Sequence, residues 1–121
     1  MMDFLEPASI PSAAPSPRIV GGVLKWYAGD TFELQVDLEL KDENGESVTI
    51  ESGQTVEFVF RDRTGRTVYA VGFEDIADNR VVVRFDASVS ALFPKGRYTY
   101  DVVYCGPVRR TLAHGAPVMV E

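Results

Sequence analysis

The stretch that decides the fold of this chain is residues 92–104, LFPKGRYTYDVVY. A short turn closes on Pro94 and Gly96, and a strand follows it. In that strand one face carries Tyr98, Tyr100, Val102 and Tyr104, and the other carries Arg97, Thr99 and Asp101. A tyrosine at the start of a late strand, just after such a corner, bonds to backbone a few residues upstream and fixes the corner between two sheets. We therefore expect Tyr98 to be a structural corner residue.

Apolar and polar residues alternate outward from this stretch, with turn residues recurring about every 8–12 residues. The pattern predicts strands at 23–27, 31–41, 48–50, 55–61, 66–73, 80–86, 97–104, 108–112 and 116–120, and one helical turn at 88–93. In the clearest run, Phe32, Leu34, Val36, Leu38 and Leu40 share one face. A period of two is typical of an antiparallel strand with one buried face. The sequence predicts an all-β, immunoglobulin-like antiparallel β-sandwich of about 7–9 strands.

Residues 1–22 differ from the rest of the chain. They hold four of its seven prolines among Ala and Ser residues, and they end in Gly21-Gly22. Because proline fixes φ and lacks a backbone donor, we expect a flexible or polyproline-like arm ahead of a sandwich domain at 23–121. The apolar side chains that are candidates to anchor the arm are Phe4, Leu5, Ile10, Ile19 and Val20. We expect them to bind a partner or a neighbouring copy; the alternative is packing on their own domain.

The chain has 121 residues, enough for one domain whose core needs neither a metal nor a disulfide. Cys105 is the one cysteine, so no internal disulfide is expected, which fits synthesis in a reducing cytosol. Uninterrupted apolar runs reach only three or four residues, so no transmembrane helix and no membrane partner are expected. Residues 1–7 lack the basic and apolar regions of a secretory signal.

The charge of the chain is unevenly distributed. Residues 1–60 hold 11 acidic and 3 basic side chains, a net of −8, and residues 61–121 hold 7 and 9, a net of +2. One interpretation is an ordinary soluble surface. The other is that unlike faces meet between neighbouring copies. A nucleic-acid partner is not expected, because the basic residues form no run and the chain is acidic overall.

Acidic side chains raise two candidate chemistries. Paired carboxylates can catalyse glycoside hydrolysis. The acidic residues here fall on the solvent-facing side of a strand or in turns, so we interpret them as solvated surface residues. The turn after Lys41 starts like a calcium loop, with Asp42, Asn44 and Glu46 at its first ligand positions. Ser47 and Gly53 stand where such a loop needs Gly and Glu, which excludes an EF-hand and leaves a weakly held ion as the alternative.

Cys105 and His114 are the only soft metal ligands, too few for a structural zinc site. A nucleophilic Cys–His pair is conceivable, but each residue precedes a glycine in a segment that a turn explains. Trp26 and Tyr27, and also Tyr69, are candidates for a surface that stacks on a sugar; the alternative is that Trp26 and Tyr27 pack in the core or under the arm. We assign no catalytic, cofactor-binding or metal-binding residue and expect a protein that is not an enzyme.

Several turn and core residues together indicate a family. They are the run Ala28-Gly29-Asp30-Thr31-Phe32, the turn Asp42-Glu43-Asn44-Gly45, Thr55-Val56 with Phe58, and Leu92, Gly96, Tyr98, Tyr100 and Asp101. These residues resemble the immunoglobulin-like domains of bacteriophage structural proteins, and most closely the N-terminal domains of baseplate upper proteins from phages of Gram-positive hosts. The resemblance covers about residues 23–120. The sequence departs from that pattern in one respect. Its domain follows a proline-rich arm, whereas such domains are often fused to longer chains.

The resemblance implies a non-catalytic virion protein that is made in the bacterial cytoplasm. It implies docking, in multiple copies, onto other virion structural proteins or onto copies of itself, in a tail, a baseplate or a capsid surface. No catalytic residue is carried over. A carbohydrate-binding or cell-surface-binding module is the alternative from another class.

Overall fold

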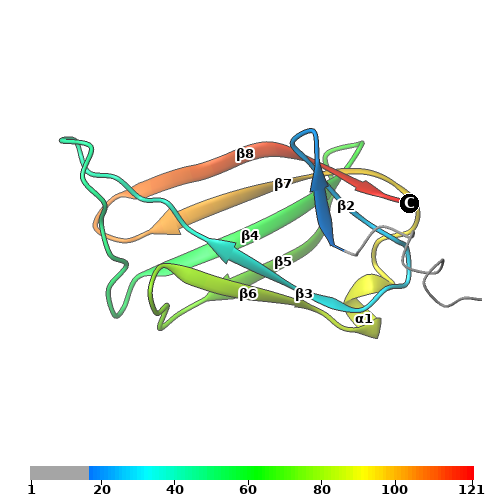
Figure 1. Ribbon diagram of the computed structural model, residues 1–121, viewed down its shortest axis with the longest axis horizontal. Helices are drawn as coiled ribbons and strands as arrows, with labels where there is room; N and C mark the ends of the chain where they lie inside the picture. Colours follow the sequence, from blue (N-terminus) through cyan, green and yellow to red (C-terminus); the bar gives the residue numbers. More distant parts are fainter. Residues whose placement is uncertain (1–16) are drawn as a thin grey trace, which may run out of the picture.

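The computed structural model describes residues 17–121, and within them the chain forms eight strands and one short helix (Figure 1). The strands are β1 (Arg18–Val20), β2 (Val23–Trp26), β3 (Phe32–Asp37), β4 (Thr55–Asp62), β5 (Thr67–Phe73), β6 (Arg80–Phe85), β7 (Gly96–Cys105) and β8 (Arg109–Val120), and the helix is α1 (Ala87–Ser90). The all-β prediction is confirmed for this part of the chain.

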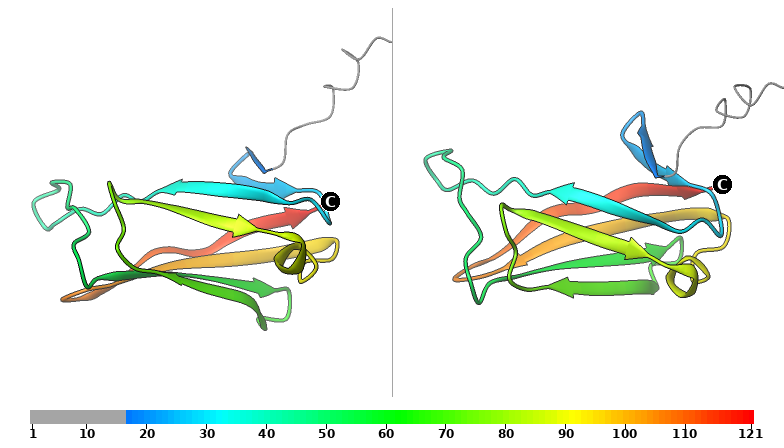
Figure 2. Two further views of the ribbon diagram at one scale, coloured as in Figure 1. Left: turned by 90° about the horizontal axis from the view of Figure 1, so that it is seen from below. Right: turned by 60° about the horizontal axis from the view of Figure 1, so that its bottom comes forward.

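The strands form two sheets that lie face to face along the length of the molecule (Figure 2). One sheet has six strands in the order β1-β2-β8-β7-β4-β5, and the other consists of β3 and β6. Among these pairings, β2 and β8 run parallel and the rest are antiparallel. The connections therefore gather at two opposite ends (Figure 1). We call the end with the turns at 62–66 and 86–95 the corner end, and the end with the loops at 38–54 and 74–79 the loop end.

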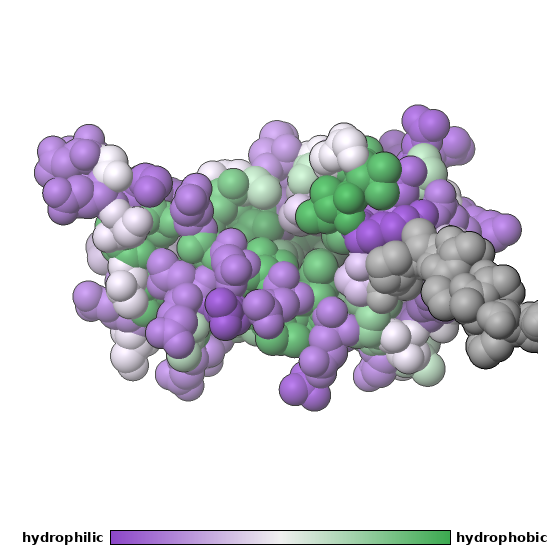
Figure 3. Space-filling model, viewed as in Figure 1, coloured by the Kyte–Doolittle hydropathy of each residue, from purple (hydrophilic) through white to green (hydrophobic). Residues whose placement is uncertain are grey.

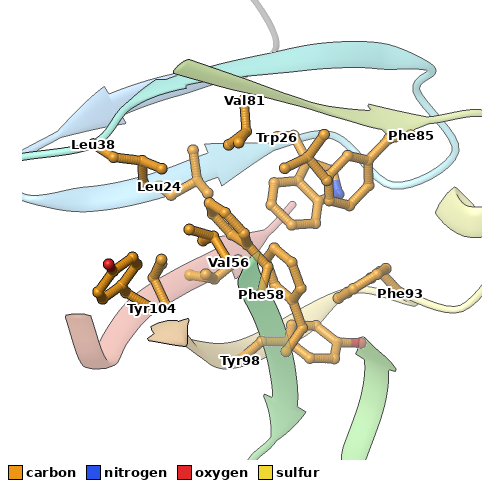
Figure 4. Close-up of a cluster of buried hydrophobic side chains, with 14 of the residues drawn as sticks. Leu24, Trp26, Leu38, Val56, Phe58, Val81, Phe85, Phe93, Tyr98 and Tyr104 are labelled. Carbon is orange, nitrogen blue, oxygen red and sulfur yellow. The ribbon is translucent and has the colours of Figure 1, made fainter. Parts of the chain in front are cut away.

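The core fills the space between the sheets, and its character changes along the molecule (Figure 4). At the corner end it is aromatic: the Trp26 ring lies 5.0 Å from Phe85 and 5.4 Å from Phe93, measured between centroids. Toward the loop end the buried side chains are Leu38, Leu40 and Ile50. Each large side chain contributes roughly 1.5–3 kcal/mol on burial, most of which is offset by the ordering of the chain.

Strand β3 is shorter than its sequence pattern predicts. The inward and outward alternation of residues 31–41 holds to its end, but the paired strand stops at Asp37. Its partner β6 begins at Arg80, opposite Asp37, so the residues beyond lack a strand to pair with. The Leu38 N–H instead donates to the Asn79 carbonyl at 2.7 Å. The prediction of a strand from 31 to 41 is therefore correct for side-chain facing and wrong for length.

Residues 48–50 form no strand, contrary to the prediction. The side chain of Asn79 takes the place of a partner strand. Its Oδ1 accepts the Ile50 N–H at 2.8 Å, and its Nδ2 donates to the Val48 carbonyl at 2.7 Å. Asn79 has a φ of 53°, a left-handed conformation that asparagine adopts more readily than most residues.

The two strands predicted at 108–112 and 116–120 are one strand, β8. Tyr100 pairs with Ala116 and Val102 pairs with Ala113, so residues 114 and 115 both lie opposite the single residue Asp101. Gly115 takes a φ of 62° in this bulge, which glycine does without strain. The bulge lets the strand continue where the sequence pattern predicts a break.

The structure adds a strand ahead of the first predicted one. Strand β1 pairs with β2 through the two-residue turn Gly21-Gly22, whose φ values are 59° and 81°. Two successive positive φ angles are the type I′ geometry that matches the twist of a hairpin. Residues 18–22, assigned from the sequence to the arm, thus form an edge hairpin of the six-stranded sheet.

The helical turn predicted at 88–93 is α1 and the turn that follows it. The Asp86 carboxylate caps α1 by accepting the Val89 N–H at 2.9 Å. The hydrogen bonds that Asp86 accepts from the Ser88 hydroxyl and from the Val89 N–H lower its pKa, whereas burial acts to raise it. The Ser90 hydroxyl donates to the Asp30 carbonyl and ties α1 to the loop before β3.

Within residues 17–121, no helix is long and apolar enough to cross a bilayer.

Candidate interaction site

Tyr98 holds the corner end in the way the sequence predicts. Its hydroxyl donates a hydrogen bond of 2.6 Å to the Pro94 carbonyl, and its ring centroid lies 5.1 Å from that of Phe93. Burial raises the pKa of Tyr98, and the nearby Asp62 charge adds to this effect. The hydroxyl therefore remains a donor at neutral pH, and Tyr98 serves the fold.

The edge hairpin β1–β2 carries an apolar surface beside this corner. Ile19 and Val20 are exposed to 70% and 49%, and Figure 3 shows the hairpin as an apolar patch among polar residues. Exposed apolar side chains on an edge strand are a place where another chain can pair or pack. The sequence prediction that these two residues are free to contact a partner agrees with their exposure.

The hairpin is fixed to the domain through Arg18. Its guanidinium lies 5.0 Å from the Tyr27 ring centroid and donates to the Glu121 carboxylate. That hydrogen bond lowers the pKa of Glu121, against the opposing effect of burial and with a smaller contribution from Lys25. The backbone adds two bonds: Glu121 N–H donates to the Trp26 carbonyl at 2.9 Å, and its carbonyl accepts the Ala28 N–H at 2.8 Å. The apolar surface is thus presented on a held element.

Three of the five predicted arm anchors, Phe4, Leu5 and Ile10, lie outside the described residues. The other two, Ile19 and Val20, are not packed into their own domain. Their strand β1 nevertheless pairs with β2 of the same domain, and that Ile19 and Val20 anchor the arm to a partner stays a prediction.

Trp26 is not a surface residue, so its prediction as a sugar-stacking residue is wrong. Its side chain is 0% exposed and packs 5.3 Å from Phe32, between ring centroids. Leu24 and Trp26 both point inward because they are two residues apart on β2. Tyr69 also belongs to the aromatic core, 6.2 Å from Phe60. Tyr27 is half-buried, with the Arg18 guanidinium over its ring.

A basic hollow opens beside the corner, between the β4–β5 turn and the start of β7. It has a volume of about 530 Å³ and is lined by Asp62, Arg63, Thr64, Lys95, Gly96, Arg97 and Tyr98. The Asp62 carboxylate is occupied: it accepts hydrogen bonds from the Thr64 hydroxyl and from backbone, which lower its pKa against the effect of burial. Sequence reasoning missed this hollow because two turns far apart in the chain form it.

Three cations of the hollow are unpaired within the part of the chain that the structure describes. Arg63, Lys95 and Arg97 form no ion pair with a carboxylate of residues 17–121. The neighbouring Arg66 contacts Asp62 at 3.7 Å. These three side chains make the hollow locally positive, although Asp62 also lines it.

At the loop end, residues 41–47 form a small turn that we call the acidic hairpin. Lys41 and Ser47 form a β-bridge at its base. Asp42 Oδ1 accepts the N–H groups of Asn44 and Glu46, both at 2.9 Å. These two bonds order the turn through one oxygen of the Asp42 carboxylate. Across residues 17–121, no group of three or more His, Cys, Asp or Glu side chains gathers closely enough to hold a metal ion.

Cys105 and His114 do not meet. Cys105 pairs with Arg109 at the start of β8, and His114 lies further along the same strand, roughly 15 Å away at about 3.3 Å per residue. His114 Nδ1 lies 3.3 Å from the Asp101 carboxylate instead. The Cys–His pair considered from the sequence is therefore not formed.

Asp101 is the centre of a polar clamp that sequence reasoning missed. Its carboxylate accepts a 2.5 Å hydrogen bond from Arg61 Nη1 and a 2.7 Å bond from the Gly115 N–H. Burial acts to raise the pKa of Asp101, but the Gly115 and Arg61 bonds and the His114 charge together lower it. The clamp fixes the β8 bulge. Gly115 is the one sequence signal for it, because the spacing of side chains does not indicate a bulge.

No protein-family model matches this chain, and no curated protein matches it in sequence. Its function must therefore be inferred from the fold and from the surfaces just described.

Proposed function

We propose that this protein is a non-catalytic structural component of a bacteriophage or prophage particle, present in multiple copies in a tail, baseplate or capsid surface. It docks through the arm, residues 1–22, whose last residues form the edge hairpin β1–β2. The observation that carries the proposal is the exposed apolar pair Ile19 and Val20 on the edge strand.

The fold we assign within this proposal is an immunoglobulin-like sandwich. Three features support it: two sheets face to face, a tyrosine corner at the start of the late strand β7, and a corner hydrogen bond to backbone four residues upstream. Phe58 and Tyr98, among the residues that resemble phage domains, are buried, in the core and at this corner, whereas Leu92 is exposed. The resemblance is thus to residues that build this fold.

The edge hairpin suits docking for an energetic reason. Burying an apolar side chain such as Ile19 against a partner contributes roughly 1.5–3 kcal/mol. Arg18 already holds the hairpin to Glu121 and Tyr27, so little further ordering of β1 opposes association. The burial of Trp26 weakens the carbohydrate-binding alternative, which named Trp26, Tyr27 or Tyr69 as stacking residues, because it removes one of the three.

The test measures how much of the chain co-sediments with phage particles that are purified from the bacterium that makes it. Four tagged forms are compared: wild type, a deletion of residues 1–20, the double variant Ile19→Ser with Val20→Ser, and Val108→Ser. Val108 is a matched control, since it is apolar and 55% exposed but lies in the β7–β8 turn at the loop end.

We expect wild type and Val108→Ser to co-sediment with particles, and the other two forms to fall at least tenfold in particle content. Thermal melting checks that the double variant stays folded, as expected for two exposed positions. Wild type absent from every particle fraction would contradict the structural role. Undiminished incorporation of the double variant would contradict docking through the hairpin.

A further inference from the structure

We propose that copies of this chain associate head to tail, with the acidic hairpin of one copy bound in the basic hollow of the next. This inference rests on the multi-copy assembly proposed above, and it names the surfaces through which copies meet.

The two surfaces lie at opposite ends of the long axis. The acidic hairpin stands out from the body at the loop end, on the left of Figure 1. The basic hollow lies at the corner end, where the turn after β4 meets the start of β7. A surface at one end that fits a different surface at the other end makes a heterologous contact, which repeats into a file or closes into a ring.

The ion pairs of the described residues leave unlike charges at these ends. Along the middle of the molecule the unlike charges of the two halves neutralise each other. Asp37 pairs with Arg80 at 2.7 Å, and Glu33 pairs with Arg84 at 3.5 Å. The −8 and +2 halves of the sequence thus meet within one copy along β3 and β6.

The loop end keeps an excess of acid. Its loops and turns, at 38–54, 74–79 and 105–110, carry the acids Glu39, Asp42, Glu43, Glu46, Glu51, Glu74, Asp75 and Asp78 against the bases Lys41, Arg109 and Arg110. None of these acids forms an ion pair within residues 17–121. At the corner end, the hollow holds the unpaired Arg63, Lys95 and Arg97 together with Asp62, which contacts Arg66.

The acidic hairpin is suited to enter such a hollow. Besides its side-chain bonds, Asp42 donates its N–H to the Glu46 carbonyl at 2.9 Å and accepts the Gly45 N–H at 3.0 Å. The turn is therefore ordered before it binds, and Glu43 and Glu46 are both exposed. The hollow of about 530 Å³ lies within the range of about 300–1,000 Å³ that small ligands fill, which is room for two carboxylate side chains.

The contact depends on charges near the surface, so salt weakens it. Exposed charges are screened beyond about 10 Å at 0.1 M salt, and each exposed pair contributes only about 0.2–1 kcal/mol. Two or three such pairs give a weak contact, so association of the free chain needs high protein concentration and low salt.

A charge-swap experiment tests the contact, with sedimentation velocity at about 50 mM NaCl as the readout. The acid swap is Glu43→Lys with Glu46→Lys, and the base swap is Arg63→Glu with Lys95→Glu. All four side chains are exposed, so each variant should fold, and thermal melting checks this. The matched control is Glu51→Lys with Glu74→Lys, which makes the same charge change at the same end but outside the hairpin.

We expect wild type and the control to form species above the 13.4 kDa monomer, and each swap alone to associate at least tenfold more weakly. A one-to-one mixture of the two swaps should associate again, because each reversed hairpin then finds a reversed hollow. A wild type that stays monomeric at every concentration, or a mixture that stays monomeric, would overturn the proposal.

These outcomes are separate from those of the particle test. The swaps leave β1 intact, and the Ile19 and Val20 variant leaves both charged surfaces intact. Head-to-tail association without incorporation into particles would contradict the virion role alone. Incorporation without rescue by mixing would contradict the head-to-tail contact alone.

Discussion

The corner end and the loop end of this molecule are stabilised in different ways. At the corner end, aromatic rings pack together and the Tyr98 hydroxyl bonds to Pro94. At the loop end, a single side chain, Asn79, holds the backbone at Val48 and Ile50. The corner end is thus built on a packed aromatic cluster, whereas the loop end combines the smaller buried side chains Leu38, Leu40 and Ile50 with a few polar contacts. The two ends should therefore respond to different substitutions.

The largest expected effect is at the corner. Tyr98→Ala removes a buried aromatic ring, and changes of that kind lower the free energy of unfolding by about 3–5 kcal/mol. Thr99 is the matched control, because it is the next residue of β7 and faces the other way. Urea unfolding should show Tyr98→Ala losing far more stability than Thr99→Ala. Equal losses would contradict the facing of β7. Tyr98→Phe should lose only about 0.5–1.5 kcal/mol, since it removes the hydrogen bond alone.

The next effect is at the loop end. Asn79→Gly removes both bonds to residues 48–50 and keeps a residue that tolerates the φ of 53°. Leaving the part-buried Ile50 N–H without a partner should lower the free energy of unfolding by about 1–3 kcal/mol. Hydrogen exchange should quicken at the Ile50 amide and remain unchanged at β7.

Asp78→Gly is the control for that change. Asp78 has nearly the same backbone conformation, with a φ of 56°, and its side chain forms no hydrogen bond or ion pair with residues 17–121. We expect its stability to change by less than about 0.5 kcal/mol. If both glycine variants lost stability equally, backbone conformation and not the Asn79 side chain would hold the loop end.

The third effect lies between the two ends, at Asp101. Its folded-state pKa is lowered, so its contribution to stability is present above the ordinary aspartate value of about 3.9. That contribution is lost as the pH falls through the lower folded value. Asp101→Asn should therefore be less stable than wild type by about 1–2 kcal/mol at pH 7.

Thermal melting from pH 7 down to about 2 checks this, and the gap between the two proteins should close as Asp101 protonates. Glu57→Gln is the control, because Glu57 is exposed on β4 and forms no ion pair within the described chain. A constant gap for Asp101→Asn at every pH would show that the carboxylate charge is not what clamps the bulge.

Sequence reasoning succeeded where a single physical signal decides the structure. The alternation of Phe32, Leu34 and Val36 gives the correct faces of β3, because the period of two reports burial directly. The corner at Tyr98 was predicted with its hydrogen bond, because a turn and a strand of fixed period place the ring. Both signals lie within one local stretch.

It failed where the deciding contact joins distant segments. Residues 48–50 bond to the Asn79 side chain instead of forming the expected strand, and the break expected before 116 is bridged by a bulge that Asp101 holds. The burial of Trp26 depends on strand β8 and the sheet opposite it. The basic hollow likewise needs two turns brought together by the pairing of β4 with β7. The structural propensity of a local stretch of sequence does not predict contacts between distant segments.

We propose that the two unlike ends bring copies of the chain together. Small-angle X-ray scattering of the full chain, over a range of concentrations at low salt, tests it most directly. Head-to-tail association into a file should make the longest dimension grow with concentration while the cross-section stays that of one copy, and added salt should reverse the growth. Growth of the cross-section at constant length, or no growth at any concentration, would contradict it.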